Sequence, residues 1–378
     1  MGGVSMEWKE VTISDIANLK NGKKRPSEPG VIPVFGGNGI MDYVNSFNGE
    51  DTIVIGRVGA YCGCVYLSKG KCWVSDNAIA AKAKEDNDNE YLYYLLSSLN
   101  LNYHHIGGAQ PLMTQDIIGR IEVIVPQTKD DQRRIASILS SLDRKIELNN
   151  KINADLEEMA QAIFKNWFVD FEPFKDGKFV DSELGMIPEG WKVGTLGDIT
   201  KNKSAKVKER NDVKVLSPVT TGELVLSEEY FTKQVFSSSI AKYKIVNKGD
   251  FAYNPARVNI GSIGRNEFDF DGCVSPVYVV FSVLDGYENY FDLFRKTDFF
   301  KDSVASLAIG GVRQSLSYDD LSLIETIIPS KNIVEKFNDF YNQMKKTIKA
   351  NKLENSRLSL LRDTLLPRLM SGELEVPE

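Results

Sequence analysis

The chain has 378 residues, a formal net charge of −6 and no apolar run long enough to span a bilayer. This length predicts two or three domains, and the acidic balance argues against nucleic acid unless positive charge is concentrated locally. Four cysteines without a Cys-x-x-Cys pair and two histidines do not provide a structural zinc site, so no metal site is expected. No cofactor is expected either. The N-terminus is polar and carries no signal peptide pattern, which favours the reducing cytoplasm.

The first globular half covers residues 1–128. Short strand-like runs alternate there with turn residues, as at Thr52–Ile55 and Cys62–Leu67, and Tyr91–Leu99 has a helical pattern. Pro126 ends the last strand-like run, and a helix is expected to begin a few residues later. We assign this half to the α+β class.

A long helix is predicted within residues 129–170. One stripe recurs there every seven positions and consists of Ile135, Leu142, Asn149, Leu156 and Ile163. Ile138, Ile152 and Met159 occupy intervening positions. A sustained seven-residue stripe indicates a coiled-coil seam, because 3.5 residues per turn keep one face toward a partner helix. Asn149 is the polar member of the stripe, and a lone Asn in such a seam costs stability and fixes the register.

A linker and a second copy of the first half follow. Residues 171–190 are rich in Pro, Gly and acidic side chains, which indicates a linker. Residues 191–330 repeat the first half: Trp8-Lys9 matches Trp191-Lys192, and Arg57-Val58 matches Arg257-Val258. The offset between the copies grows by 17 between Gly222 and Phe251, so the second copy carries an insertion there. A strand at Tyr278–Val283 and a helix at Asn289–Phe300 complete this half.

The second long helix lies within residues 331–378. Its stripe consists of Phe337, Met344, Asn351, Leu358 and Leu365, each 202 residues after its counterpart. Pro367 and Gly372 are expected to terminate it. Two unrelated amphipathic helices on separate cores are the alternative, but that reading does not explain five matched positions at one offset. We therefore expect the helices to pair with each other, with Asn149 and Asn351 close together at the centre.

Two basic clusters occupy equivalent positions in the two halves. Lys20, Lys23 and Arg25 correspond to Lys203, Lys206 and Lys208, with Lys24 and Arg210 beside them. Lys and Arg supply most phosphate contacts, so two matched clusters suit two similar contacts with one duplex. A solvated loop is the ordinary explanation of a single cluster. Further candidates for DNA contact are Asn38, Arg57, Gln110, Arg257, Arg313 and Gln314.

A glycine-rich loop raises a second hypothesis. Phe35–Gly39 fits the Phe-x-Gly-x-Gly loop with which methyltransferases bind S-adenosylmethionine, and Asn254-Pro255-Ala256 half-resembles their Asn-Pro-Pro-aromatic loop. The two segments lie in different copies of the repeat, whereas a methyltransferase needs both in one domain. Ala256 and Arg257 also replace the second Pro and the aromatic residue that would hold a flipped base. We therefore interpret Phe35–Gly39 as a turn or DNA-facing loop.

Three segments resemble the specificity (S) subunits of Type I restriction–modification systems. They are Ala162–Phe171 (AIFKNWFVDF), Leu184–Trp191 (LGMIPEGW) and Thr364–Gly372 (TLLPRLMSG), and the resemblance extends over essentially the whole chain. It implies an α+β, pseudo-two-fold molecule with two target-recognition domains, residues 1–128 and 191–330. Two helices that pair as an antiparallel coiled coil would join them.

The resemblance also implies a function and partners. Each target-recognition domain would read one half of a bipartite, asymmetric double-stranded DNA site. The helices would set the spacer length and bind two modification (methyltransferase) subunits, and restriction (translocase–nuclease) subunits could join. The chain itself would be non-catalytic and would not contact a membrane. The alternatives are a stand-alone adenine DNA methyltransferase and a protein-interaction scaffold without a DNA role.

Overall fold

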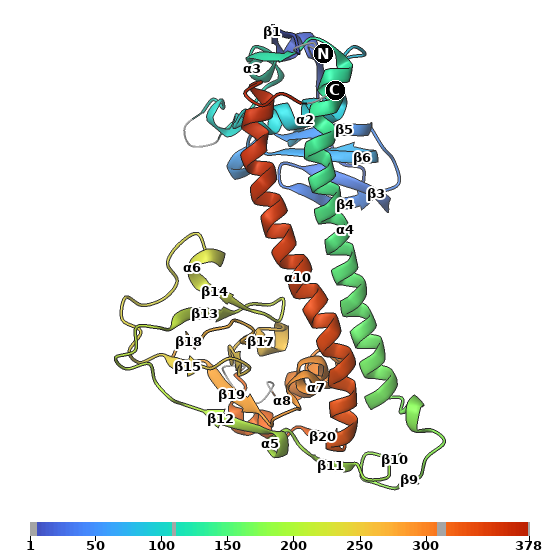
Figure 1. The fold of residues 1–378 in the computed structure, drawn as a ribbon, viewed down its shortest axis with the longest axis vertical. Helices are drawn as coiled ribbons and strands as arrows, with labels where there is room; N and C mark the ends of the chain where they lie inside the picture. The colour runs from blue at the N-terminus through green and yellow to red at the C-terminus, as the bar shows by residue number, and fades with distance from the viewer. Residues whose placement is uncertain (1–5, 108–110, 308–314, 377–378) are drawn as a thin grey trace, which may run out of the picture. The chain divides into compact units, whose positions relative to one another are not determined.

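The chain folds into two compact units. The computed structural model describes residues 6–107, 111–307 and 315–376. One unit consists of residues 1–151 and 350–378, and the other consists of residues 152–349. Each unit contains a mixed α and β domain and one half of each long helix, α4 (Lys129–Phe168) and α10 (Lys331–Met370) (Figure 1). In the described part of the chain, no helix is long and apolar enough to cross a membrane.

The first unit is built on a six-stranded sheet of order β2-β7-β5-β6-β3-β4. Its strands are β2 (Ala17–Asn21), β3 (Pro29–Gly36), β4 (Gly39–Val44), β5 (Gly49–Gly56), β6 (Val65–Val74) and β7 (Ala78–Ala83). A separate antiparallel pair joins β1 (Trp8–Thr12) to β8 (Glu122–Pro126). The helical segments are α1 (Ile13–Ile16), η1 (Gly59–Tyr61), α2 (Asn89–Ser98), η2 (Leu101–Tyr103) and α3 (Gln115–Gly119). The core of the unit includes Ile53 and Ile79 of the sheet, Tyr91 of α2 and Ile135 of α4.

The second unit contains two four-stranded sheets, of order β12-β19-β16-β17 and β14-β13-β18-β15. Their strands are β12 (Thr200–Lys203), β13 (Lys214–Pro218), β14 (Leu224–Leu226), β15 (Lys244–Val246), β16 (Phe251–Tyr253), β17 (Ile263–Arg265), β18 (Gly272–Val274) and β19 (Val279–Val283). An antiparallel pair joins β11 (Lys192–Thr195) to β20 (Glu325–Ile328). The linker forms η3 (Glu172–Phe174) and a small hairpin of β9 (Phe179–Val180) and β10 (Ile187–Pro188). The remaining helical segments are α5 (Leu196–Ile199), α6 (Ser227–Tyr230), η4 (Val258–Ile260), α7 (Glu288–Phe294), α8 (Asp298–Leu307) and α9 (Tyr318–Ser322).

The two units repeat one strand order, which confirms the duplication. The 10-residue strand β6 corresponds to two short strands, β17 and β18, so the single sheet of the first unit becomes two sheets in the second. In both units the first strand of a hairpin runs parallel to this part of the sheet. In the first unit β3 is parallel to β6, with Val34 paired to Trp73, and in the second β13 is parallel to β18, with Lys214 paired to Gly272. The predicted insertion forms α6 and β15, and β15 pairs with β18.

Even the local capping chemistry is repeated. Thr12 precedes α1 and its peptide N–H donates to the carboxylate of Asp15 (2.8 Å). Thr195 precedes α5 and makes the same bond to Asp198 (2.7 Å). Each pair forms a capping box, which satisfies peptide groups that the first turn of a helix leaves unpaired.

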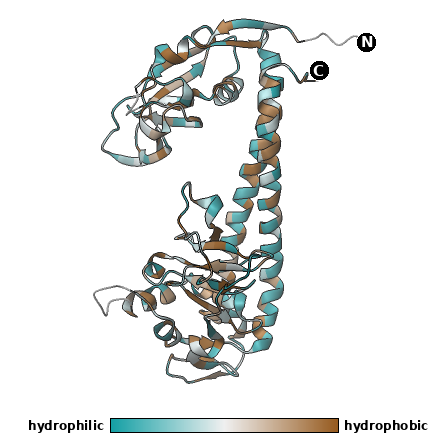
Figure 2. Cartoon of the chain, turned by 90° about the vertical axis from the view of Figure 1, so that its left-hand side faces the viewer, coloured by the Kyte–Doolittle hydropathy of each residue, from teal (hydrophilic) through white to brown (hydrophobic). Residues whose placement is uncertain are grey.

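Within the first unit, the long helices pair antiparallel, as predicted. Asp143 of α4 accepts a hydrogen bond from Arg362 of α10 (2.7 Å), whereas Lys145, further along α4, pairs with the earlier residue Glu354 (3.3 Å). Figure 2 shows apolar and polar residues alternating along both helices. The expected stripes face inward: Ile135, Asn149 and Phe337 are buried, and partly buried are Leu142, Leu156, Ile163, Met344, Asn351, Leu358 and Leu365.

The intervening seam positions were predicted one residue too early. Met159 is 51% exposed, and Ile138 and Ile152 are only partly buried. The residues that accompany the first stripe instead lie four after each of its members, and include Leu139, Asn153 and Ala160, all buried. Near the start of α4, apolar residues lie both three and four positions after a member of the stripe, so the sequence pattern did not show which of the two positions faces the seam.

Asn149 is fully buried and forms polar contacts across the seam. Its amide donates to Glu354 (2.7 Å) and Asn355 (2.9 Å), and its oxygen accepts from Lys145 (3.0 Å). These partners lie about one turn further along α10 than Asn351, whose proximity to Asn149 stays a prediction. The Asn149 amide and the Lys145 ammonium lower the pKa of the Glu354 carboxyl.

Two predicted boundaries were wrong. Pro367 lies inside α10, which continues to Met370, since a proline in the last turn removes one hydrogen bond without preventing three further helical residues. Gly372 follows with φ +74°, and a Cβ there would lie 2.9 Å from the Trp8 ring, so both conformation and packing require glycine. The single helix expected at Asn289–Phe300 is two helices, because α7 ends at Phe294 and α8 begins at Asp298.

Candidate nucleic-acid interface

Several connections meet at one end of the six-stranded sheet. The peptide N–H of Lys23, after β2, donates to the carbonyl of Val74 at the end of β6 (3.0 Å). The peptide N–H of Arg57, after β5, donates to Asn77 in the β6–β7 turn (3.0 Å). The β3–β4 turn joins them, since a Cβ on Gly37 would lie 3.6 Å from the Asn77 carbonyl oxygen. The fold therefore brings together connections that carry predicted contact residues far apart in the sequence.

The lysines of this first basic cluster are available to a ligand. Lys20, Lys23 and Lys24 are exposed, and within the described residues their ammonium groups have no hydrogen-bond or ion-pair partner. Arg25 differs, because it forms an ion pair with Asp42 of β4 and the two side chains are 46% and 44% exposed. Its charge is therefore partly compensated.

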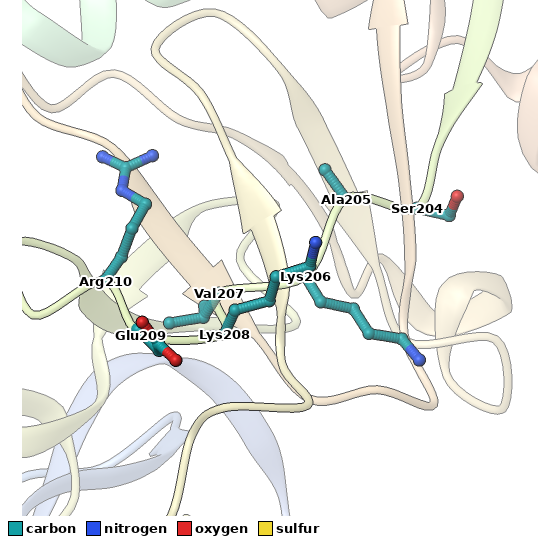
Figure 3. A pocket seen from close by; sticks show the side chains of 7 residues that line it. All are labelled: Ser204, Ala205, Lys206, Val207, Lys208, Glu209 and Arg210. Atoms are coloured by element: carbon teal, nitrogen blue, oxygen red, sulfur yellow. The ribbon is translucent and has the colours of Figure 1, made fainter.

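The second basic cluster lies on the loop that follows β12. Residues 204–210 line an open hollow (Figure 3). Val207 is buried against Tyr243 and its peptide N–H donates to the Tyr243 carbonyl (2.9 Å). The peptide N–H of Lys208 donates to Ala241 (2.9 Å), which holds Lys208 in a left-handed conformation (φ +55°) that is uncommon for a non-glycine residue. Lys206 and Lys208 are exposed and, among the described residues, have no side-chain polar partner.

Two members of the second cluster are held by carboxylates. Lys203 donates to both oxygens of the buried Asp250 (2.8 and 2.9 Å), so its charge supports the fold. Burial raises the pKa of Asp250, while Lys203 opposes that rise. Arg210 donates to Asp212 (2.6 and 2.9 Å) and Asp271 (3.0 Å), and it lowers the pKa of Asp212 to about 2. Neither cation is free to bind phosphate in this arrangement.

The remaining candidates have different environments. Asn38 is exposed in the β3–β4 turn, and Arg257 is exposed just before η4. Arg57, the counterpart of Arg257, is half-buried, with one guanidinium nitrogen 3.5 Å from the Asp76 carbonyl oxygen. The predicted contacts Gln110, Arg313 and Gln314 lie outside the described residues.

The glycine-rich segment is a turn, as interpreted from the sequence. Phe35 pairs with Ile40 and Gly36 pairs with Gly39, so the segment forms the end of the antiparallel β3–β4 hairpin. A cofactor loop of a methyltransferase lies instead at the edge of a doubly wound sheet, between a strand and a helix. Within the described residues, no group of three or more His, Cys, Asp or Glu side chains is arranged to hold a metal ion.

Comparisons with known proteins relate most of the chain to Type I restriction enzyme specificity subunits. The family model described as Type I restriction modification DNA specificity domain matches residues 6–158. The Type I restriction enzyme MjaIX specificity subunit of Methanocaldococcus jannaschii is 29% identical over an alignment of 306 positions, gaps included, that covers 77% of this chain and 70% of the relative. The Type I restriction enzyme HindI specificity subunit of Haemophilus influenzae is 27% identical over an alignment of 375 positions, gaps included, that covers 75% of this chain and 77% of the relative.

A solved structure has the same fold. The S subunit of a Type-I restriction-modification system from M. genitalium superposes with a TM-score of 0.63, covering 97% of this chain and 96% of its own. Its sequence is 17% identical to this chain, so the likeness is one of fold.

Proposed function

The chain belongs to the specificity subunits of type I restriction–modification systems, and from this premise we propose that it reads a bipartite DNA site. One unit reads each half of the site. The observation that carries this proposal is the duplication of a loop-bearing sheet end with uncompensated lysines: Lys20, Lys23 and Lys24 in one unit, Lys206 and Lys208 in the other. Because their loops differ in sequence, the two half-sites should differ, which makes the whole site asymmetric.

Local charge reconciles DNA binding with the negative total. The net charge of −6 is a sum over the whole chain and does not fix the charge at the loops. Phosphate contacts depend on the cations that remain free at the loops. Modification subunits on the same DNA would supply further phosphate contacts.

The long helices set the distance between the half-sites and bind two modification (methyltransferase) subunits. Each helix has 40 residues and is therefore about 60 Å long. Large apolar side chains remain exposed on them, including Leu148 on α4 and Leu353 and Leu360 on α10, where the last is 70% exposed. Exposed apolar groups on a rigid helix suit a protein partner. We further propose that restriction (translocase–nuclease) subunits join the assembly.

The chain itself is non-catalytic in this proposal. The β3–β4 turn does not have the setting of a cofactor loop, and Ala256 and Arg257 stand where a base-holding loop needs Pro and an aromatic residue. The purified chain should neither bind S-adenosylmethionine nor transfer a methyl group to DNA. Methyl transfer by the pure chain would favour the rival reading, a stand-alone methyltransferase.

Sequencing of methylated adenines tests the function directly. Cells that contain the modification subunits should show a bipartite methylated motif when this chain is present and lose it when the chain is deleted. A motif that persists without the chain would contradict the proposal, and so would a motif with one continuous recognition sequence.

A further inference from the structure

Two equivalent turns lie beside the basic loops and were not among the sequence candidates. One joins β6 to β7, where the carbonyl of Ser75 accepts from the Ala78 peptide N–H (3.0 Å). The other joins β18 to β19, where Ser275 accepts from Tyr278 (3.0 Å). Both central residues of each turn are exposed, Asp76-Asn77 in the first and Pro276-Val277 in the second. Asn77 and Val277 thus occupy the same position of the repeat.

The first turn is fixed to its neighbours by backbone hydrogen bonds. Gly22 donates to the carbonyl of Ala78 (3.0 Å), and Lys23 donates to Val74 (3.0 Å). Arg57 donates to the carbonyl of Asn77 itself (3.0 Å). The turn is therefore held between the free lysine cluster and Arg57, and a site that is already ordered loses less entropy when it binds.

The second turn is held in a similar place by different contacts. The ammonium group of Lys244 donates to the carbonyl of Tyr278 (2.6 Å), and Lys244 is bridged through its backbone to Lys206 of the second basic loop. The inserted strand β15 supplies Lys244, so the insertion links this turn to the cations beside it.

The tips of both turns carry no cation. Asp76 repels phosphate, and Pro276 and Val277 offer neither a charge nor a side-chain donor. In the first unit the basic loop lies on one side of the tip and Arg57 on the other, which matches the order of groups in a groove, where phosphates lie at the sides and base edges in the middle. In the second unit Lys206 lies on one side of the tip. Solvated turns are the ordinary explanation of exposed tips, and Val277 is 72% exposed, which leaves its methyl groups accessible to a ligand.

We propose that these turns read bases, and this proposal rests on the function proposed above. The Asn77 amide, which has no polar partner among the described residues, pairs with the major-groove edge of an adenine: its NH₂ donates to N7 and its oxygen accepts from the N6 amino group. Val277 contacts the C5-methyl group of a thymine. The first half-site therefore contains an adenine read by Asn77, and the second contains a thymine read by Val277.

Base analogues that delete single groups test each contact. The full chain with its modification subunits is titrated with duplexes of the methylated motif, in which 7-deazaadenine replaces each adenine of the first half-site in turn. Uracil replaces each thymine of the second. The wild type should lose about fivefold in affinity at one adenine, the value of one hydrogen bond. It should lose about fourfold at one thymine, the value of one buried methyl group.

Variants assign the effects to the turns. Asn77→Ala should bind the unmodified site more weakly and become insensitive to 7-deazaadenine at that position, and Val277→Ala should become insensitive to uracil. Asn77→Asp, which keeps the shape but loses the donor, should behave like Asn77→Ala. Asn18→Ala and Val235→Ala, at exposed residues outside the turns, should keep the wild-type sensitivities.

The outcomes separate the two proposals. If the wild type is insensitive at every position, or if the turn variants keep its sensitivities, the turns do not read these bases although the chain can still be a specificity subunit. A half-site without any A·T pair would also overturn the proposal. If no bipartite site depends on the chain at all, the proposed function fails, and the base-reading role fails with it.

Discussion

The salt dependence of DNA binding should distinguish free cations from cations that support the fold. Neutralising Lys20, Lys23 and Lys24 together, each to Gln, removes three exposed charges without a polar partner in the described structure. If all three contact phosphates, the slope of log K against log salt should fall in magnitude by about 2.7, because each contact contributes about 0.9. Between 50 and 200 mM salt this difference corresponds to about 40-fold in affinity.

The second basic loop should give a smaller change. Lys206 and Lys208 are its two free lysines, and changing both to Gln should lower the slope by about 1.8. Lys203→Gln is the matched control from the same cluster. Its ammonium group is bonded to the buried Asp250, so the variant should lose thermal stability and keep the wild-type slope.

Fluorescence anisotropy with a labelled cognate duplex at five or more salt concentrations gives these slopes. The methylated motif of each variant should be unchanged, since phosphate contacts position the protein and do not specify bases. If the triple variant and the double variant both keep the wild-type slope, these clusters do not contact phosphates and are ordinary solvated loops. If Lys203→Gln lowers the slope of log K against log salt by as much as the loss of one free lysine does, ion pairing in the fold does not decide which cations bind DNA.

Three further perturbations test the helices and the second unit. Changing Asn149 and Asn355 to Leu should raise the melting temperature by about 2–4 °C, because apolar packing replaces a polar pair in the seam, of which Asn149 is buried and Asn355 partly buried, and should loosen helix register; a lower melting temperature would contradict this. Burial raises the pKa of Asp292, but Arg295 and Lys345 lower it more, to a value well below 3.8. A carboxyl group whose pKa is lower in the folded than in the unfolded state stabilises the fold at pH values above its unfolded-state pKa. The free energy of unfolding should therefore fall as the pH drops below about 4, and it should fall less steeply in Asp292→Asn. Inserting one heptad into both α4 and α10 lengthens each by about 10 Å, so the unread spacer, but not the half-sites, should lengthen by about three base pairs; an unaltered spacer would show that the helices do not set it.

The sequence predicted the architecture because duplication leaves a signal at every level. The 202-residue offset between Ile135 and Phe337 marked the two helices, and the matched Trp-Lys openings marked the two domains. The sequence did not predict which of two adjacent apolar residues faces the partner helix. Ile138 and Leu139 are both apolar, and only the packing in the structure shows that Leu139 is the buried one. Pro367 misled for a related reason: a proline in the last turn costs too little to end a helix immediately.

Residue types in the sequence were enough to nominate the basic clusters as a candidate site. They did not show which lysines are paired with a carboxylate, because those pairs join residues far apart in the sequence. Lys203 and Lys206 look alike in the sequence, but Asp250, 47 residues from Lys203, pairs with one of them and not with the other. Asn77 was missed because an Asn in a short turn is ordinary. One sequence signal pointed to this position: Asn77 follows the repeated Val-Ser pair by two residues. The equivalent position of the second copy holds Val277, which is exposed.

Domain exchange followed by sequencing of methylated adenines tests the two-reader account most directly. Residues 1–126 are replaced by the equivalent segment of a relative that has a different motif, and the long helices stay unchanged. One half of the methylated sequence should change to that of the donor, while the other half and the spacer length stay the same. If both halves change, or if neither does, the two units do not read the DNA independently and the account is wrong.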